Sequence, residues 1–387
     1  MNILVNGYFY GSNCPPFVRS LKSINPDIKL TNSLSILDEH GINKDYLEYE
    51  DIIKLKLNFI ERSIVLISKK VRLPFWKICL IRKAKKLIKE YKPDIIINHK
   101  ASEKAEIMLK TGFRPQLTYI YGGEVQGDRL MKKGLAYILK KSTYIITTTE
   151  QMKYYLSDKF NSLKNKIKVY PFGNSDLENI LKYKDTNRKE DIKQKYGFKL
   201  NDTVIFDNRS LRGSHSGFHS IIEALKILAE KKIQIKIFFL RGFLGTDYMI
   251  KQLHNIKKNN PNLENHILLI DDIVSTDQII EYYYLSDAFI SLLPTDQFGK
   301  SISDAVLLDC SLILSDLDVY KFHLGNGPAY ITNQNPNQLA KTFESITYGK
   351  SFKVDRTNYE QLKENFNPEI RFKNLYGFLD KLISKKI

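Results

Sequence analysis

The chain lacks the features that mark several common protein classes. It has three cysteines among its 387 residues, Cys14, Cys79 and Cys310. They are too few and too scattered for a disulfide framework or a cysteine-based metal site. No run of eighteen apolar residues occurs, so no membrane-spanning helix is predicted. The first residues show neither the basic leader nor the long apolar run of a signal peptide. We therefore expect a cytoplasmic protein in a reducing compartment.

Several catalytic motifs are also missing. The sequence shows no Walker-type phosphate loop, no Ser-His or Cys-His constellation for nucleophilic catalysis, no internal repeat and no low-complexity segment. We expect neither a bound cofactor nor a metal ion. Apolar residues make up 43% and aromatic residues 12% of the chain, which is a globular composition. A chain of this length is large enough for two domains, each with its own core.

Acidic residues are scarce in one segment of a chain whose net charge is +17. Between Arg62 and Lys92, eleven basic residues stand against Glu90 alone. Apolar residues interleave with these charges, a pattern typical of helices with one apolar and one basic side. Two interpretations stay open: a solvated lysine-rich helix packed on the core, or a surface that binds the anionic inner face of the cell membrane peripherally. Nucleic acid is less favoured because no recognition motif is present.

Apolar runs alternate with helical stretches along the chain. We predict strands near 2–9, 92–100, 116–124 and 142–150, and again at 203–207, 233–240, 266–270 and 288–294. Helices are predicted at 17–23, 217–231, from 247, at 276–286 and from about 301. Such alternation indicates parallel, doubly wound sheets. The polar segment 170–191 interrupts the pattern, so it is the best candidate for a linker between two such domains.

One loop of the second half carries polar residues at a place where ligands commonly bind. Residues 291–316 read SLLPTDQFGKSISDAVLLDCSLILSD. The loop follows a predicted strand, and ligands of doubly wound sheets bind beyond the carboxyl ends of the strands. The helix that starts after Gly299 favours phosphate, and Lys300 adds positive charge. Asp304 could accept hydrogen bonds from two ribose hydroxyls, and Asp296 from another polyol. Taken alone, these residues also fit an ordinary turn and helix start.

This loop resembles a motif of the family 4 glycosyltransferases of the GT-B fold. The family carries a Glu, then Phe-Gly, then a second Glu eight positions after the first. The chain has Asp296, Phe298-Gly299 and Asp304 in that frame. Four segments that precede this loop match other motifs of the family more weakly, in the family's order, so that the resemblance covers nearly the whole chain: KPDIIINHK, STYIITTTEQM, IKVYPFGNSD and NRSLRGSHSGFHSIIEALKIL. The chain departs from the family at both acidic positions, at Ser216 in place of a phosphate-binding Lys, and at Asp309 and Ser311 in place of Gly and Pro.

The resemblance implies an α/β fold of the GT-B type, with two Rossmann-like domains facing across a cleft. Residues 1–172 would bind the acceptor, residues 173–368 would bind the nucleotide-sugar, and residues 369–387 would form a helix that packs back toward the first domain. The implied activity is transfer of a hexose from a nucleotide-sugar to an acceptor, with retention of the anomeric configuration. The acceptor would be a lipid-linked or cell-surface glycan.

The resemblance also implies roles for particular residues. The catalytic group would be Arg209, Arg212, Lys300 and Asp296, and which arginine contacts the diphosphate stays open. The donor would be bound by Asp296, Gln297, Phe298, Gly299, Lys300, Ser301 and Asp304. On the acceptor side we expect Gly11, His99 and Glu124.

Three other functions remain as alternatives to a glycosyltransferase of this family. They are an epimerase of nucleotide-sugars, a catalytically degenerate homologue that binds membrane or glycan, and a metal-dependent transferase using the triplet Asp316-Leu317-Asp318.

Overall fold

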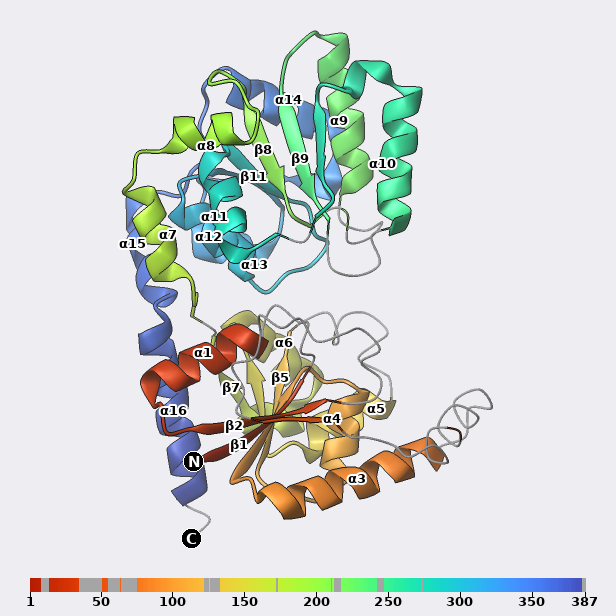
Figure 1. Ribbon diagram of the computed structural model, residues 1–387, viewed down its shortest axis with the longest axis vertical. Coiled ribbons are helices and arrows are strands. Elements are labelled where there is room, and N and C mark those ends of the chain that lie inside the picture. Colours follow the sequence, from red (N-terminus) through yellow and green to blue (C-terminus); the bar gives the residue numbers. More distant parts are fainter. Residues whose placement is uncertain are drawn as a thin grey trace. The chain divides into compact units, whose positions relative to one another are not determined.

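The computed structural model describes most of the chain as two compact units (Figure 1). The described residues are 1–7, 14–34, 51–54, 63, 75–121, 125, 133–171, 173–209, 211, 217–241, 247–272 and 274–384. The first unit comprises Met1–Ser175 and Asn367–Ile387, and the second comprises Asp176–Phe366. Each unit has its own sheet and its own hydrophobic core.

Within the described residues, the first unit contains a parallel sheet of seven strands in the order β3-β2-β1-β4-β5-β6-β7. These strands are β1 (Asn2–Asn6), β2 (Lys29–Leu34), β3 (Asp51–Lys54), β4 (Ile95–His99), β5 (Gln116–Ile120), β6 (Tyr144–Thr147) and β7 (Ile167–Val169). Successive side chains of a strand point to opposite faces. Ile3 and Val5 accordingly join one core cluster, and Leu4 between them joins another.

Helices cover both faces of this sheet. Ile3 and Val5 share a cluster with α1 (Cys14–Ile24) and α16 (Pro368–Ser384), and the rings of Phe17 and Phe372 meet with centroids 5.6 Å apart. Leu4 shares its cluster with α3 (Phe75–Tyr91) and α4 (Glu103–Leu109). The described residues of this unit also form α5 (Lys133–Lys141), α6 (Glu150–Lys159) and the short η3 (Asn161–Lys166). The last helix of the chain thus completes the core of the first unit.

The second unit has a parallel sheet of six strands among the described residues, in the order β10-β9-β8-β11-β12-β13. The strands are β8 (Val204–Asp207), β9 (Lys236–Leu240), β10 (Ile267–Ile270), β11 (Ala288–Ser291), β12 (Ser311–Ser315) and β13 (Ala329–Ile331). One face is covered by α9 (Phe218–Glu230), α10 (Asp247–Asn259) and α14 (Pro336–Thr347). The other face packs against α11 (Thr276–Leu285), α12 (Lys300–Leu307), α13 (Asp318–Leu324) and α15 (Arg356–Asn365). The described part of the unit also contains two 3-10 turns, η5 (Pro261–Leu263) and η6 (Thr332–Gln334).

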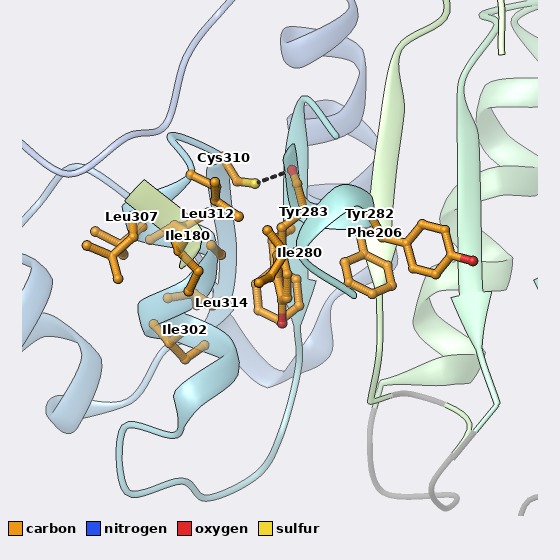
Figure 2. Close-up of a cluster of buried hydrophobic side chains, with 14 of the residues drawn as sticks. Ile180, Phe206, Ile280, Tyr282, Tyr283, Ile302, Leu307, Cys310, Leu312 and Leu314 are labelled. Atoms are coloured by element: carbon orange, nitrogen blue, oxygen red, sulfur yellow. Dashed lines mark hydrogen bonds between the residues drawn. The ribbon is translucent and has the colours of Figure 1, made fainter. Parts of the chain in front are cut away.

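Figure 2 shows the core between the sheet and the second group of helices. Phe206 of β8 packs among Tyr282 and Tyr283 of α11, with the ring centroids of Phe206 and Tyr283 4.8 Å apart. The thiol of Cys310 donates to the carbonyl oxygen of Tyr283 at 3.1 Å. Burial raises the pKa of Cys310 to about 12, so this cysteine is an unreactive core residue.

The segment 170–191 differs from the linker that its polar composition predicts. It contains α7 (Leu177–Lys184) and the start of α8 (Lys189–Lys195). Leu177 and Ile180, three residues apart, lie on one face of α7 and are buried in the core of the second unit. The chain therefore passes from one unit to the other within a few residues. At Gly173 a Cβ would lie 2.2 Å from the backbone of Pro368, so only glycine fits beside the returning chain.

Each sheet reverses its strand order once, between β1 and β4 in the first unit and between β8 and β11 in the second. At such a point the loops of neighbouring strands run in opposite directions and open a crevice beyond the carboxyl ends of the strands. The prediction of an α/β fold with two doubly wound parallel sheets is confirmed. None of the described helices is long and apolar enough to cross a membrane.

Candidate functional site

The candidate donor site lies where the loops after β8 and β11 diverge. Residue Ala288 of β11 pairs with Ile205 of β8 in parallel register, so both strands end at the same edge of the sheet. The loop after β8 supplies Arg209, and the loop after β11 supplies Asp296. These two side chains come from positions 87 residues apart and form an ion pair with 3.2 Å between Nη1 and Oδ2.

Arg209 is held in place from several directions. Its backbone N–H donates to Asp207 Oδ1 at 2.8 Å, which turns the chain sharply at the end of β8. Its Nε donates to the hydroxyl of Ser301 at 3.0 Å. The side chain is 13% exposed. Burial disfavours the charge of Arg209, but the charge of Asp296 and its hydrogen bond, together with Tyr320 and Tyr283, raise the pKa of the guanidinium. Among the described residues, none accepts a hydrogen bond from Nη2.

Asp296 uses one carboxylate oxygen for the protein. Its Oδ2 accepts from Arg209 Nη1, from the Tyr320 hydroxyl at 2.9 Å and from the Gly299 N–H at 3.4 Å. Among the described residues, none donates to Oδ1. A carboxylate can accept about four hydrogen bonds. Oδ1 can therefore accept a ligand hydroxyl while Oδ2 keeps the side chain oriented.

The turn before α12 is strained and closely packed. Phe298 has a φ of +56°, a left-handed conformation that is rare for a bulky side chain. Its ring stacks on Phe366 with centroids 5.6 Å apart, which holds the strained turn in place. Gly299 follows, and a Cβ there would lie 2.4 Å from Arg209 Nη2. Backbone strain of this kind is often found at ligand-binding sites.

Lys300, at the start of α12, lies between two carboxylates. Its Nζ is 2.6 Å from Asp304 Oδ2, one helical turn onward, and 3.0 Å from Asp176 Oδ2. Burial opposes its charge, but Asp304 and Asp176 together raise the pKa of Lys300. Asp304 itself is 3% exposed. In the structure Lys300 therefore neutralises two acidic groups.

On the acceptor side, only one of the three predicted residues can be described. His99 ends β4 at the switch point of the first sheet and is 3% exposed. Its Nδ1 lies 2.7 Å from the hydroxyl of Tyr121, and its ring stacks on Tyr119 with centroids 5.3 Å apart. Burial lowers the pKa of His99 to about 3, so its ring is neutral near pH 7. Gly11 and Glu124 lie outside the described residues.

The structure brings most of the predicted donor-site residues together. Arg209, Asp296, Gly299 and Ser301 are in direct contact, and Lys300 contacts Asp304 on the same helix. Gln297 and Phe298, which are buried, connect these groups in the loop. The structure places Arg209 in this group, and Arg212 lies outside the described residues.

Sequence reasoning missed residues that contact this site from other elements. They are Asp176, Asn208, Tyr283 and Tyr320, and Asn208 Nδ2 donates to the Tyr283 hydroxyl at 2.7 Å. Asp176 stands in the motif IKVYPFGNSD and could have been considered on that ground. The two tyrosines gave no signal, because they look like other apolar positions of their helices.

The triplet Asp316-Leu317-Asp318 has structural roles. Asp316 pairs with Lys321 and accepts from the Thr332 hydroxyl at 3.3 Å, and Asp318 begins α13. The described residues contain no cluster of three or more His, Cys, Asp or Glu side chains arranged to hold a metal ion.

Comparisons with known proteins agree with this fold. No protein family model matches the chain. It is 22% identical to an uncharacterised glycosyltransferase of Methanocaldococcus jannaschii over 305 residues, 73% of this chain and 71% of that protein. It is 24% identical over 313 residues to the UDP-N-acetylglucosamine–N-acetylmuramyl-(pentapeptide) pyrophosphoryl-undecaprenol N-acetylglucosamine transferase of Finegoldia magna, covering 78% of this chain and 76% of that protein.

Solved structures are similar over the full length. Anabaena HepE in complex with UDP and glucose has a TM-score of 0.75 at 15% identity, and 99% of this chain and 100% of that chain are covered. A glycosyltransferase from Rickettsia africae has a TM-score of 0.73 at 16% identity, with 99% and 98% covered. The predicted GT-B fold is thereby confirmed, and the sequence similarity is to glycosyltransferases.

Proposed function

We propose that this protein is a glycosyltransferase that takes a sugar from a nucleotide-sugar donor and transfers it to an acceptor with retention of the anomeric configuration. The observation that carries the proposal is Arg209, a buried, fixed cation beside the start of α12 at the switch point of the second sheet. The sequence relatives are named glycosyltransferases, and HepE has also been solved with UDP-glucose. None of the similar proteins named above is an epimerase.

The geometry fits the chemistry of a departing nucleoside diphosphate. Negative charge builds up on the diphosphate as the sugar bond breaks, and donors fixed in advance stabilise that charge best. Arg209 Nη2 and the first-turn amides of α12 would supply this stabilisation. Asp304 would bind the ribose hydroxyls, and Asp296 Oδ1 a hydroxyl of the sugar. The protein would thus contact each part of the donor with a separate group.

Calorimetric titration with a panel of nucleoside diphosphates and their sugars tests the donor. In an unfolding measurement, a ligand at a hundred times its Kd should raise the free energy of unfolding by about 2.7 kcal/mol. Arg209→Ala should lower the transfer rate by about a hundred- to a thousandfold. Arg241→Ala is the matched control, because Arg241 is a more exposed arginine of the same unit that pairs with Asp247 and Asp271. Nuclear magnetic resonance of the product reports its anomeric configuration.

The possible results separate the alternatives. Failure of every nucleotide and nucleotide-sugar in the panel to bind would contradict the proposal. Product formed without any acceptor would favour an epimerase. Binding without transfer or hydrolysis of a labelled donor would favour a degenerate homologue.

For the acceptor we propose a lipid-linked glycan, reached through peripheral binding of an anionic membrane by α3. Trp76, Leu80, Ala84 and Leu87 of this helix pack into the core. Its other side exposes Arg82, Lys85, Lys86 and Lys89, and Ile78 among them is 46% exposed. Each basic residue near an anionic surface contributes on the order of 1 kcal/mol, falling with salt. The exposed isoleucine would add apolar contact with the lipid.

Vesicle sedimentation tests this surface. The variant with Arg82, Lys85, Lys86 and Lys89 changed to Gln should lose binding to vesicles rich in phosphatidylserine, and high salt should release the parent protein. The control changes Lys251, Lys258, Lys341 and Lys350, four exposed lysines of the second unit, in the same way. Equal loss in both variants, or equal binding of the parent to neutral vesicles, would contradict the proposal.

A further inference from the structure

A buried tyrosine reaches the donor site from within the core. Tyr320 lies on α13 and is fully buried, with its ring in the core cluster of the second unit. Its hydroxyl donates to Asp296 Oδ2 at 2.9 Å. Phenylalanine would fill the same apolar space, so packing alone does not account for the hydroxyl. A buried hydroxyl is costly unless it has a hydrogen-bond partner, and here the partner is a carboxylate of the candidate site.

The carboxylate that Tyr320 holds also holds Arg209. Oδ2 of Asp296 receives the tyrosine hydroxyl, the guanidinium and the Gly299 N–H, which together fix the plane of the carboxylate. If the tyrosine hydroxyl is removed, the remaining donors come from a loop and a long side chain. The carboxylate can then rotate, which moves Oδ1, while the bond from Arg209 Nε to Ser301 still holds the arginine.

The aspartate itself makes this support necessary. Asp296 stands where the resembling family has Glu, so its carboxylate is one methylene closer to the backbone. The Tyr320 hydroxyl approaches from the side of the core and contacts the shorter side chain directly. Burial and the charge of Asp296 raise the pKa of Tyr320, so the hydroxyl stays protonated and able to donate.

We infer that Tyr320 is a positioning residue of the donor-sugar site. It fixes Asp296 so that Oδ1 meets a hydroxyl of the transferred sugar. This inference rests on the proposed function, because it assigns a specificity role within the same site.

Tyr320→Phe separates this role from a purely structural one. We expect the free nucleoside diphosphate to bind Tyr320→Phe within about twofold of the parent. Affinity for the nucleotide-sugar and the transfer rate should fall about tenfold, the effect of weakening one hydrogen bond to a charged group. Tyr330→Phe is the matched control, because Tyr330 donates to the Gly325 carbonyl in the same unit, away from Asp296.

A double-mutant cycle with Asp296→Ala shows whether Tyr320 acts through the aspartate. Once Asp296 is removed, Tyr320→Phe should cause no further loss of nucleotide-sugar affinity. The probes are UDP and UDP-glucose, with the other pairs of the panel used if these do not bind. An additive cycle, or equal losses for nucleotide and nucleotide-sugar, would overturn the inference while leaving the proposed function intact. If the parent binds no nucleotide of the panel, the proposed function and this inference fall together.

Discussion

Replacing Lys300 with methionine tests how the charges of the candidate donor site depend on one another. The lysine Nζ bridges Asp304 and Asp176 at 2.6 and 3.0 Å, and the side chain of Asp304 is 4% exposed. Removing one partner of a buried ion pair costs about 3–5 kcal/mol. The lysine side chain is 35% exposed, so water screens part of this interaction and reduces its value. We expect Lys300→Met to destabilise the second unit by about 2 kcal/mol.

The two units can be followed separately during unfolding. Trp76 is the single tryptophan of the chain and packs in the core of the first unit. Tryptophan fluorescence therefore reports the first unit, while far-ultraviolet circular dichroism reports both. Lys300→Met should shift the dichroism transition to lower urea and leave the fluorescence transition in place. Lys226→Met is the control, because Lys226 forms an exposed pair with Glu223 on α9.

Nucleotide binding by the same variant decides what Lys300 does. If it acts by holding Asp304 for the ribose, nucleoside mono- and diphosphates should lose affinity by the same factor, about tenfold. If it contacts the second phosphate, the diphosphate should lose far more than the monophosphate. We expect the affinities for the monophosphate and the diphosphate to fall equally, since the ammonium group of Lys300 is already paired with two carboxylates. A larger loss for the diphosphate, or no change in the dichroism transition, would refute this reasoning.

Two further predictions concern a glycine and a histidine. Gly299→Ala places a Cβ against Arg209, whose guanidinium is held by Asp296, so transfer should fall about a hundredfold, as for a displacement near 1 Å. Gly377→Ala is its control, since a Cβ there meets nothing within 4 Å. Because burial lowers the pKa of His99 from 6.5 to about 3, the unfolded chain gains a proton between these values that the folded unit does not. The free energy of unfolding of the first unit should therefore decrease by about 2 kcal/mol between pH 7 and pH 5 because of His99. The His99→Gln variant should lack this part of the decrease when unfolding is followed by fluorescence.

Each of these two predictions has an outcome that would contradict it. Equal activity of the Gly299→Ala and Gly377→Ala variants would show that Arg209 moves aside at no cost. An exposed histidine on α9, His219, provides the comparison for His99. If His99→Gln and His219→Gln show the same pH dependence as the parent, the buried histidine does not couple folding to protonation.

The sequence predicts the buried strands well and the polar elements less well. All five residues of β4 are buried, and the apolar run of this strand was sufficient to identify it. β2 reads KLTNSL and was not predicted, because its polar residues give no apolar run. It is defined by its parallel pairing with β1. The helix α7 was mistaken for a linker because it is short and lies in a segment that is polar and charged on the whole.

The candidate site shows the same division. Asp296, Gly299 and Asp304 lie within one loop and helix start, so their spacing could be recognised locally. Arg209 is 87 residues away from Asp296, and Tyr320 comes from yet another helix. Only the strand order brings these side chains together, and a single sequence gives no measure of such distances. Pairings across a sheet therefore had to come from the structure.

The pairing of every described cation of the site with a carboxylate has a physical reason. A largely buried guanidinium or ammonium without a partner would destabilise the unit by several kcal/mol whenever no donor is bound. Asp296 removes this cost for Arg209, and Asp304 with Asp176 removes it for Lys300. The cations are thus already in place before a ligand arrives, so little reorganisation is needed at the moment of reaction. Among the described residues none donates to Asp296 Oδ1, so this carboxylate can pair with Arg209 and still accept a hydroxyl group of the proposed donor.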